Sequence, residues 1–414
     1  MGLQSADTFD VAVVGAGPAG AATATHLARA GCYVVVLDRA TFPRDKPCAE
    51  YLSPAAEPLL ARLGALDEIE RTLPGRLRGF RVYAPNGTSF QGDFAATRDA
   101  SGTSRFEIGL TVPRLRLDAA LVAAARRAGV DVREGWRLTQ VEREAGSGYW
   151  TLRPADGGAP VRARLLVAAD GSHSTVARRL GLHAPTRMRK VALVAHLRGI
   201  AGLSEYGEVH VAGRRYVGLA PLEPPDVGDL CNVALVVDER RDGRHIAQQR
   251  PQAFLLAALR TFPQLRGRLD QISVARATLT TSGMRVRARH MAGEALLLVG
   301  DAGGYYDPFT GEGIYRALRG AELAAEVAAP ALAADDLSAR ALARYATLQR
   351  QEFRGKRAIE AIIQSAVQVP PVMDHIARQM RARKQMADTV VAVTGDYLPA
   401  SAVLRPGYLL RLLV

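Results

Sequence analysis

Residues Asp10–Arg39 read DVAVVGAGPAGAATATHLARAGCYVVVLDR, and this stretch decides the fold. An apolar, strand-like run leads into Gly15, Gly17 and Gly20, which have the G-x-G-x-x-G spacing, and an alanine-rich, helix-like stretch follows them. A second apolar run then ends at Asp38. The first glycine permits a tight turn, the second lets the backbone approach a pyrophosphate, and the third lets the helix pack closely on the strand. The order of strand, turn, helix, strand and acid therefore predicts a dinucleotide-binding unit, with either NAD or FAD as its ligand.

The same stretch supplies the groups that would touch the nucleotide. The backbone N–H groups at the start of the helix, next to Pro18, would face the phosphates, where the helix dipole favours negative charge. Asp38 can accept hydrogen bonds from a ribose. Arg39 has two interpretations, a solvated side chain or one that stacks on the adenine.

Composition narrows the class of protein. The chain has 414 residues, 48% of them hydrophobic and 23% charged, which predicts two or three globular domains. Three cysteines fit a reducing compartment without structural disulfides, and neither a metal-ligand motif nor a signal peptide stands out. No apolar run reaches the roughly 18–20 residues that a membrane-spanning helix needs. We expect a cytoplasmic protein, or one attached to a membrane from outside.

The formal net charge of +13 does not identify a partner by itself. Basic residues spread along the chain and do not form one block, which favours a solvated surface over a nucleic-acid interface. We therefore expect a small-molecule substrate, apolar or aromatic, and no nucleic acid. The basic helical tail (340–384) and the terminal segment (404–414) leave peripheral membrane contact open as an alternative to docking on the body of the protein. The oligomeric state stays open.

Along the chain, α/β-type segments alternate with antiparallel, period-2 segments. We expect a mixed α/β protein in which a Rossmann-like domain is interleaved with an antiparallel-sheet domain and followed by a helical tail. The expected nucleotide-binding segments are 1–75, 111–185 and 285–335; the expected substrate-domain segments are 76–110 and 186–284; the tail is 336–414.

Three segments together resemble the FAD-binding fold of the p-hydroxybenzoate hydroxylase superfamily. They are the glycine turn with Asp38, LLVAADGSHSTVAR at 165–178, and ALLLVGDAGGYYDPFTGEGI at 295–314. Within that superfamily, PCAEYLSP at 47–54 and DPFTGEGIYRA at 307–317 resemble the branch of geranylgeranyl reductases and flavin-dependent halogenases. The resemblance implies an FAD-binding domain of glutathione-reductase type, FAD as cofactor, and NAD(P)H as reductant.

The resemblance also implies roles for individual residues. Asp301 would bind the ribityl chain, Arg114 would contact FAD, and the first turn of a helix near Ile314 would face the flavin edge and stabilise negative charge there. The full expected cofactor set is Gly15, Gly17, Pro18, Gly20, Asp38, Arg39, Arg44, Cys48, Ala49, Arg114, Asp301, Pro308, Gly311, Gly313 and Ile314.

Several residues keep two interpretations. In the first interpretation, Asp170 and Arg178 pair with each other or cap a helix. In the second, Asp170 takes part in nicotinamide binding. Cys48 is either an inert buried thiol or faces the substrate. Of the adjacent Tyr305 and Tyr306, we expect one to pack in the core.

For activity, our leading hypothesis is a monooxygenase that uses NAD(P)H and oxygenates a small-to-medium apolar metabolite through a flavin hydroperoxide. The alternative is a double-bond reductase of the geranylgeranyl reductase type, acting on an isoprenoid or polyketide-like chain. A third hypothesis is a non-catalytic flavin-bound protein at a membrane surface. Candidate groups for proton transfer are Glu50, Tyr51 and Tyr216. Gly218 and Ala220 stand where the resembling enzymes carry bulky aromatic residues. This difference argues against a halogenase, predicts a different or wider pocket, and for that reason argues against geranylgeranyl substrates too.

Overall fold

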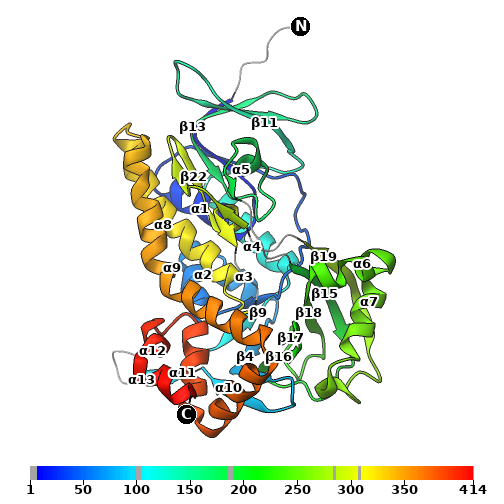
Figure 1. Cartoon of the computed structure of the whole chain (residues 1–414). Helices are drawn as coiled ribbons and strands as arrows, with labels where there is room; N and C mark the ends of the chain where they lie inside the picture. The colour runs from blue at the N-terminus through cyan, green and yellow to red at the C-terminus, as the bar shows by residue number, and fades with distance from the viewer. Residues whose placement is uncertain are drawn as a thin grey trace.

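The computed structural model of the chain describes residues 7–94, 96–98, 104–184, 190–282, 286–305 and 309–413. Its first sheet is mainly parallel and contains the predicted glycine-turn strand (Figure 1). The parallel strands, in spatial order, are β10 (Asp131–Arg133), β2 (Val34–Leu37), β1 (Asp7–Val14), β13 (Val161–Ala168) and β22 (Leu296–Leu298). The hairpin β11 (Leu138–Arg143) and β12 (Trp150–Pro154) extends it, with β12 antiparallel to the first half of β13.

Both faces of this sheet are covered, which explains why its strands read as continuous apolar runs. Alternate residues of the strands pack against α1 (Pro18–Arg29), α4 (Arg114–Arg127) and α8 (Gly313–Ala333). The other residues pack against the β11–β12 hairpin and α5 (Thr175–Arg179). Because β1, β13 and β22 are parallel, their carboxyl ends meet at one edge of the sheet, which is where a doubly wound sheet binds its ligand.

The second sheet has seven strands and stands beside the first (Figure 1). Its order is β19 (Ser273–Thr281), β15 (Lys190–Arg198), β18 (Cys231–Asp238), β17 (Arg215–Pro221), β16 (Tyr206–Ala212), β5 (Gly79–Tyr83) and β6 (Ser89–Asp93). Neighbours are antiparallel except β16 and β5. One face packs on α7 (Pro251–Leu259), next to α6 (Glu239–Gln248), and the other faces the nucleotide-binding domain and the C-terminal helices.

The C-terminal helices close part of the second sheet. They are α9 (Ala339–Gln368), α10 (Pro370–Ala382), α11 (Lys384–Thr394), α12 (Ser401–Leu404) and α13 (Pro406–Leu413). Helices α10 and α11 lie against β6, whereas α9 runs along α8 (Figure 1). The last helix is docked: the buried Tyr408 hydroxyl donates to the Met386 carbonyl oxygen at 2.7 Å. Within the residues that the structure describes, no helix combines the length and apolarity needed to cross a bilayer.

Short elements connect these layers. They are α2 (Ala56–Leu63), α3 (Leu66–Glu70), β3 (Tyr51–Leu52), β4 (Gly75–Leu77), β7 (Ala96–Arg98), β8 (Ser104–Phe106), β9 (Gly109–Thr111), β14 (His183–Ala184), β20 (Val286–Ala288), β21 (Ala292–Gly293) and β23 (Gly304–Tyr305). The mixed α/β architecture with a helical tail confirms the fold class expected from the sequence.

Candidate functional site

The glycine turn has the geometry that its sequence predicts. Gly15 lies at φ 100°, and a Cβ placed there would sit 2.5 Å from the carbonyl oxygen of Ala169. A Cβ at Gly20 would sit 1.7 Å from the Gly15 carbonyl oxygen. Gly17 is the N-cap of α1, and Pro18 is its first residue. The turn therefore presents the free N–H groups of α1 to the edge of the sheet.

Two arginines face this turn and share one buried carboxylate. The Arg114 guanidinium donates two hydrogen bonds of 2.8 Å to Asp118, and Arg44 forms an ion pair with the same carboxylate at 2.6 Å. Although burial opposes its charge, Asp118 raises the pKa of Arg114 above its ordinary value. A Cβ at Gly17 would lie 3.5 Å from Arg44 Nη2 and 4.0 Å from Arg114 Nη2. Two cations for one carboxylate leave positive charge beside the helix N-terminus, which suits a pyrophosphate.

Asp38 ends β2 at the same edge. Its carboxylate accepts hydrogen bonds from the backbone N–H groups of Ala16 at 2.7 Å and Ala40 at 2.8 Å. These bonds fix the carboxylate beside the glycine turn and leave lone pairs for the hydroxyls of a ribose. Arg39 is exposed, so both interpretations of it stay open.

Asp301 approaches the turn from the far segment of the chain. It follows Gly300, whose φ is 62° and whose Cβ would lie 2.7 Å from the Ala19 side chain. Burial raises the pKa of the Asp301 carboxyl, while Lys46 and Arg114 oppose that rise. Lys46 was not among the residues expected from the sequence. Burial lowers the pKa of its ammonium group, and the Arg114 charge lowers it further.

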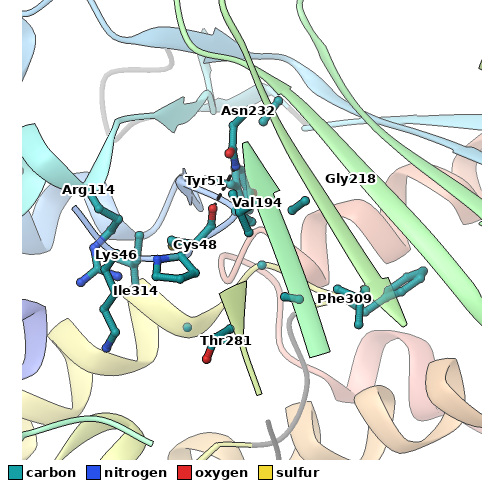
Figure 2. A pocket seen from close by; sticks show the side chains of 18 of the residues that line it. Lys46, Cys48, Tyr51, Arg114, Val194, Gly218, Asn232, Thr281, Phe309 and Ile314 are labelled. Carbon is teal, nitrogen blue, oxygen red and sulfur yellow. Dashed lines mark hydrogen bonds between the residues drawn. The ribbon is translucent and has the colours of Figure 1, made fainter. Parts of the chain in front are cut away.

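One cavity joins these groups to the second sheet (Figure 2). In Figure 2, Lys46, Arg114, Cys48 and Ile314 lie on one side, and Gly218 lies on a strand of the sheet on the other. Of the residues expected from the sequence, the cavity lining includes Gly17, Pro18, Cys48, Ala49, Tyr51, Arg114, Tyr216, Asp301, Gly311, Gly313 and Ile314. Pro308 and Tyr306, and the side chain of Tyr305, lie outside what the structure describes.

Tyr51 is held between two glycines. A Cβ at Gly311, which has φ 71°, would lie 2.6 Å from the Tyr51 ring, and one at Gly109 would lie 2.7 Å from it. Its hydroxyl is buried and has no hydrogen-bond partner among the described residues. Burial, followed by the Glu312 charge, raises the pKa of this hydroxyl well above its ordinary value. Tyr51 therefore presents a neutral O–H group beside the turn that precedes α8.

Glu50 occupies a different position. Its side chain is fully buried, with the backbone at φ 58°, and does not line the cavity. Its carboxylate meets His196 Nε2 at 2.6 Å and the backbone N–H of Arg114 at 3.1 Å. Arg276 Nη1, which also binds Asp45, donates to it at 3.3 Å. Because His196 and Arg276 belong to the second sheet, Glu50 joins the two domains.

The remaining sequence candidates have clear structural surroundings. Tyr216, on β17, stacks edge-on against Phe309 with ring centroids 4.9 Å apart. Asp170 accepts from the N–H groups of Thr175 at 2.6 Å and Val176 at 3.3 Å, so it caps α5. Burial raises the pKa of the Cys48 thiol, which keeps it protonated near neutral pH. The proton-transfer roles of Glu50, Tyr51 and Tyr216 stay predictions.

The residues present fit FAD. The glycine turn has no Cβ at Gly17, the Arg44–Arg114 pair lies next to it, and Asp301 lies close enough to Arg114 and Lys46 for their charges to oppose the rise that burial causes in its pKa. The cavity then continues past Gly311 and Gly313 toward the second sheet. Such a site holds an anionic nucleotide at one end and leaves an apolar space at the other.

Comparison with known proteins gives the same cofactor. A family model described as "FAD binding domain" matches residues 8–336. The chain is 30% identical to digeranylgeranylglycerophospholipid reductase 1 of Methanothermobacter thermautotrophicus, over 83% of each protein. It is 32% identical to menaquinone reductase of Mycobacterium tuberculosis, over 78% of this chain and 76% of the relative.

Among solved structures, a flavoprotein/dehydrogenase from Cytophaga hutchinsonii superposes with a TM-score of 0.79 at 18% identity, covering 94% of this chain and 93% of that one. At this identity the likeness concerns the fold alone. The family match, the relatives and the geometry of the site agree: the chain belongs to the FAD-binding domain family and is an FAD-dependent oxidoreductase.

Proposed function

We propose that the protein is an FAD-dependent reductase that saturates a carbon–carbon double bond in an isoprenoid or similar apolar chain, with NAD(P)H as the electron source. One observation carries the proposal. The cavity lining supplied by the second sheet is mostly aliphatic, with Ala192, Val194, Val209, Ala234 and Val236 between the polar Asn232 and the aromatic Tyr216. The two reductase relatives support it, because both names denote enzymes of lipids that carry isoprenoid chains.

Two features of the cavity lining favour the transfer of a hydride to an apolar substrate. Bound FAD, once reduced, supplies hydride chemistry. The N–H groups of the first turn of α8, which begins at Gly313, lack intrahelical partners and stabilise negative charge at the cavity wall. The aliphatic surface excludes water from the double bond, so that the hydride is not lost to solvent protons.

Saturation needs a proton as well as a hydride, since each of the two carbons gains one hydrogen. Tyr51 is the candidate whose position fits this role, because the residue lines the cavity and its neutral hydroxyl is buried and unpartnered among the described residues. The Glu50 carboxylate binds His196 in the contact between the two domains, and the Tyr216 ring packs against Phe309. We therefore assign proton donation to Tyr51, followed by its reprotonation from solvent.

The experiment is anaerobic turnover. The purified holoprotein is reduced with NADH or NADPH and mixed with a polyprenyl substrate in the absence of O₂. The molecular mass of the product is then measured by mass spectrometry. We expect bleaching of the flavin spectrum on reduction and a product heavier by two hydrogens. Consumption that requires O₂ and adds one oxygen atom would refute the reductase and support the monooxygenase hypothesis.

A lipid substrate connects this proposal to the membrane. An isoprenoid chain dissolves in a bilayer and not in water, so the protein would meet it at the membrane surface as a peripheral protein. Co-sedimentation of the full chain with vesicles, compared with a chain that ends near Ser401, tests whether the terminal helices take part. Equal binding of the two would exclude the terminal segment as the anchor.

A further inference from the structure

The cavity floor is ordered in three cross-strand rows, because β17, β18 and β15 pair in register. Each row has one residue from each strand, in that order: Ala220, Asn232 and His196; Gly218, Ala234 and Val194; Tyr216, Val236 and Ala192. All of these residues except His196, which binds Glu50, line the cavity. Successive rows are two residues apart, so the first and third are roughly 14 Å apart along the strands. The floor therefore changes from polar, through small, to aromatic in a single direction.

The first row carries a buried acceptor without a partner. Asn232 is 1% exposed and lines the cavity. Its Nδ2 donates to the carbonyl oxygen of Cys48 at 3.0 Å, which fixes the orientation of the amide, since a carbonyl can only accept. Its Oδ1 is buried and has no hydrogen-bond partner among the described residues. A buried acceptor in an apolar cavity is costly unless a ligand donates to it.

The second row leaves an open space. A Cβ placed on Gly218 would meet no atom closer than the Glu208 carbonyl oxygen at 4.0 Å. The backbone of Gly218 is not in the left-handed region, so the local conformation does not require glycine. The neighbouring Ala234 and Val194 are also small. What the absent side chain provides here is room in the cavity.

The third row closes the floor. Tyr216 and Phe309 both line the cavity and stack at 68° between their ring planes. Behind them lies the apolar core that the C-terminal helices share with the sheet. A hydrocarbon chain of a ligand that lies along the floor from Asn232 past Gly218 would therefore meet the rings of Tyr216 and Phe309.

We propose that the substrate carries a hydroxyl group that donates to Asn232 Oδ1, and that its adjoining hydrocarbon lies over Gly218 toward Tyr216 and Phe309. This rests on the proposed function and narrows its substrate class to unsaturated chains with a hydroxyl group close to the double bond. An ether or an ester at that place would leave the Asn232 oxygen without a donor.

The first test compares two ligands on the wild-type holoprotein. Farnesol has a hydroxyl group that can donate a hydrogen bond to Asn232 Oδ1, whereas farnesyl methyl ether has a methyl group in place of that hydrogen. Their affinities for the oxidised protein are measured by titration calorimetry, without turnover, so the result does not depend on whether the reaction is reduction or oxygenation. We expect farnesol to bind about tenfold more tightly, the value for one buried hydrogen bond. Equal affinities would overturn the proposal.

The second test uses variants. Asn232→Leu removes the acceptor at similar size, together with the donor to the Cys48 carbonyl oxygen. We expect the preference for farnesol to fall to within about twofold, and the FAD content is measured in the same protein. Gly218→Leu fills the open space, and we expect both ligands to lose affinity by the same factor, about tenfold or more, with the preference kept. Gly243→Leu, on α6 outside the cavity, is the matched control.

The outcomes separate the proposal from its alternatives. An Asn232→Leu protein that keeps its preference for farnesol would overturn the hydroxyl assignment. One that loses FAD and keeps the preference would show that Asn232 serves the cofactor. A Gly218→Leu protein that binds both ligands like the Gly243→Leu control would show that the hydrocarbon does not lie over the second row.

Discussion

Exchanging Glu50 for glutamine tests whether this residue joins the two domains or transfers protons. Its carboxylate has three donors around it, His196, the Arg114 backbone N–H and Arg276, at 2.6, 3.1 and 3.3 Å. Glutamine keeps the size of the side chain and one acceptor oxygen, but it removes the charge. The variant therefore changes the electrostatics of the joint and leaves its packing in place.

The expected loss follows from these contacts. A hydrogen bond to a charged group contributes about 1.5–3 kcal/mol and a neutral one about 0.5–1.5 kcal/mol. Neutralising an acceptor shared by two side-chain donors should therefore reduce the free energy of unfolding by about 2–3 kcal/mol. For a domain of roughly 150–250 residues this lowers the melting temperature by about 4–12 °C. Glu50→Ala, which leaves Arg276 with fewer partners in a buried place, should lose about 3–5 kcal/mol.

Thermal unfolding of the FAD-loaded protein, followed by circular dichroism, measures this loss. Glu142→Gln, at an exposed position of β11, is the control for removing one negative charge and should melt like the wild type. Once the FAD content is equalised, kcat should fall far less than for a lost proton donor. If the Glu50→Gln protein melts at the wild-type temperature and its kcat falls 100-fold or more, Glu50 does not stabilise the contact between the two domains. Its role is then proton transfer.

Four shorter predictions test the rest of the site. Gly20→Ala should prevent folding, seen as lost circular dichroism and a colourless protein, because the new Cβ would lie 1.7 Å from a carbonyl oxygen. Arg44→Met should weaken FAD binding by about 10–100-fold in fluorescence titration, since one charge-assisted contact is lost. Tyr51→Phe should keep FAD and lower kcat by about 100-fold or more. In the wild type, burial raises the pKa of the Tyr51 hydroxyl, so this hydroxyl stays protonated and its ionisation should not lower kcat up to about pH 10. The Cys48 thiol, whose pKa is raised by burial, should react slowly with iodoacetamide at pH 8 in the folded protein and readily in guanidinium.

The geometry of the glycine turn and of the start of α8 could be predicted from the sequence because its determinants are local. Gly15 and Gly20 are required by contacts within one strand–turn–helix unit and with the strand next to it. Asp38 ends the next strand and accepts from the turn itself. The helix expected from about Gly313 begins there, after a glycine at positive φ. Short-range geometry of this kind leaves a pattern in the residue types.

The substrate half could be predicted only in outline because its determinants are long-range. Lys46 and Asn232 lie in unremarkable stretches, and only the packing of two domains brings them into the cavity. The carboxylate of Glu50 makes it a candidate for proton transfer, but no local signal in the sequence shows that its partners are His196 and Arg276, 146 and 226 residues away. The small residue Gly218 did predict an altered pocket, because its position in the strand was recognisable.

The loop from Asp45 to Glu50 explains how the two halves depend on each other. Its Lys46 belongs to the nucleotide end of the cavity, its Cys48 carbonyl oxygen accepts from Asn232, and its Glu50 anchors the sheet. A change in this loop therefore alters FAD binding and substrate binding together. The second row of the floor is different, since the space at Gly218 borders no residue of the loop within 4 Å. Substitutions there can alter the substrate without cost to the cofactor site, which is a physical reason for enzymes with one FAD-binding half to differ in the sheet that faces it.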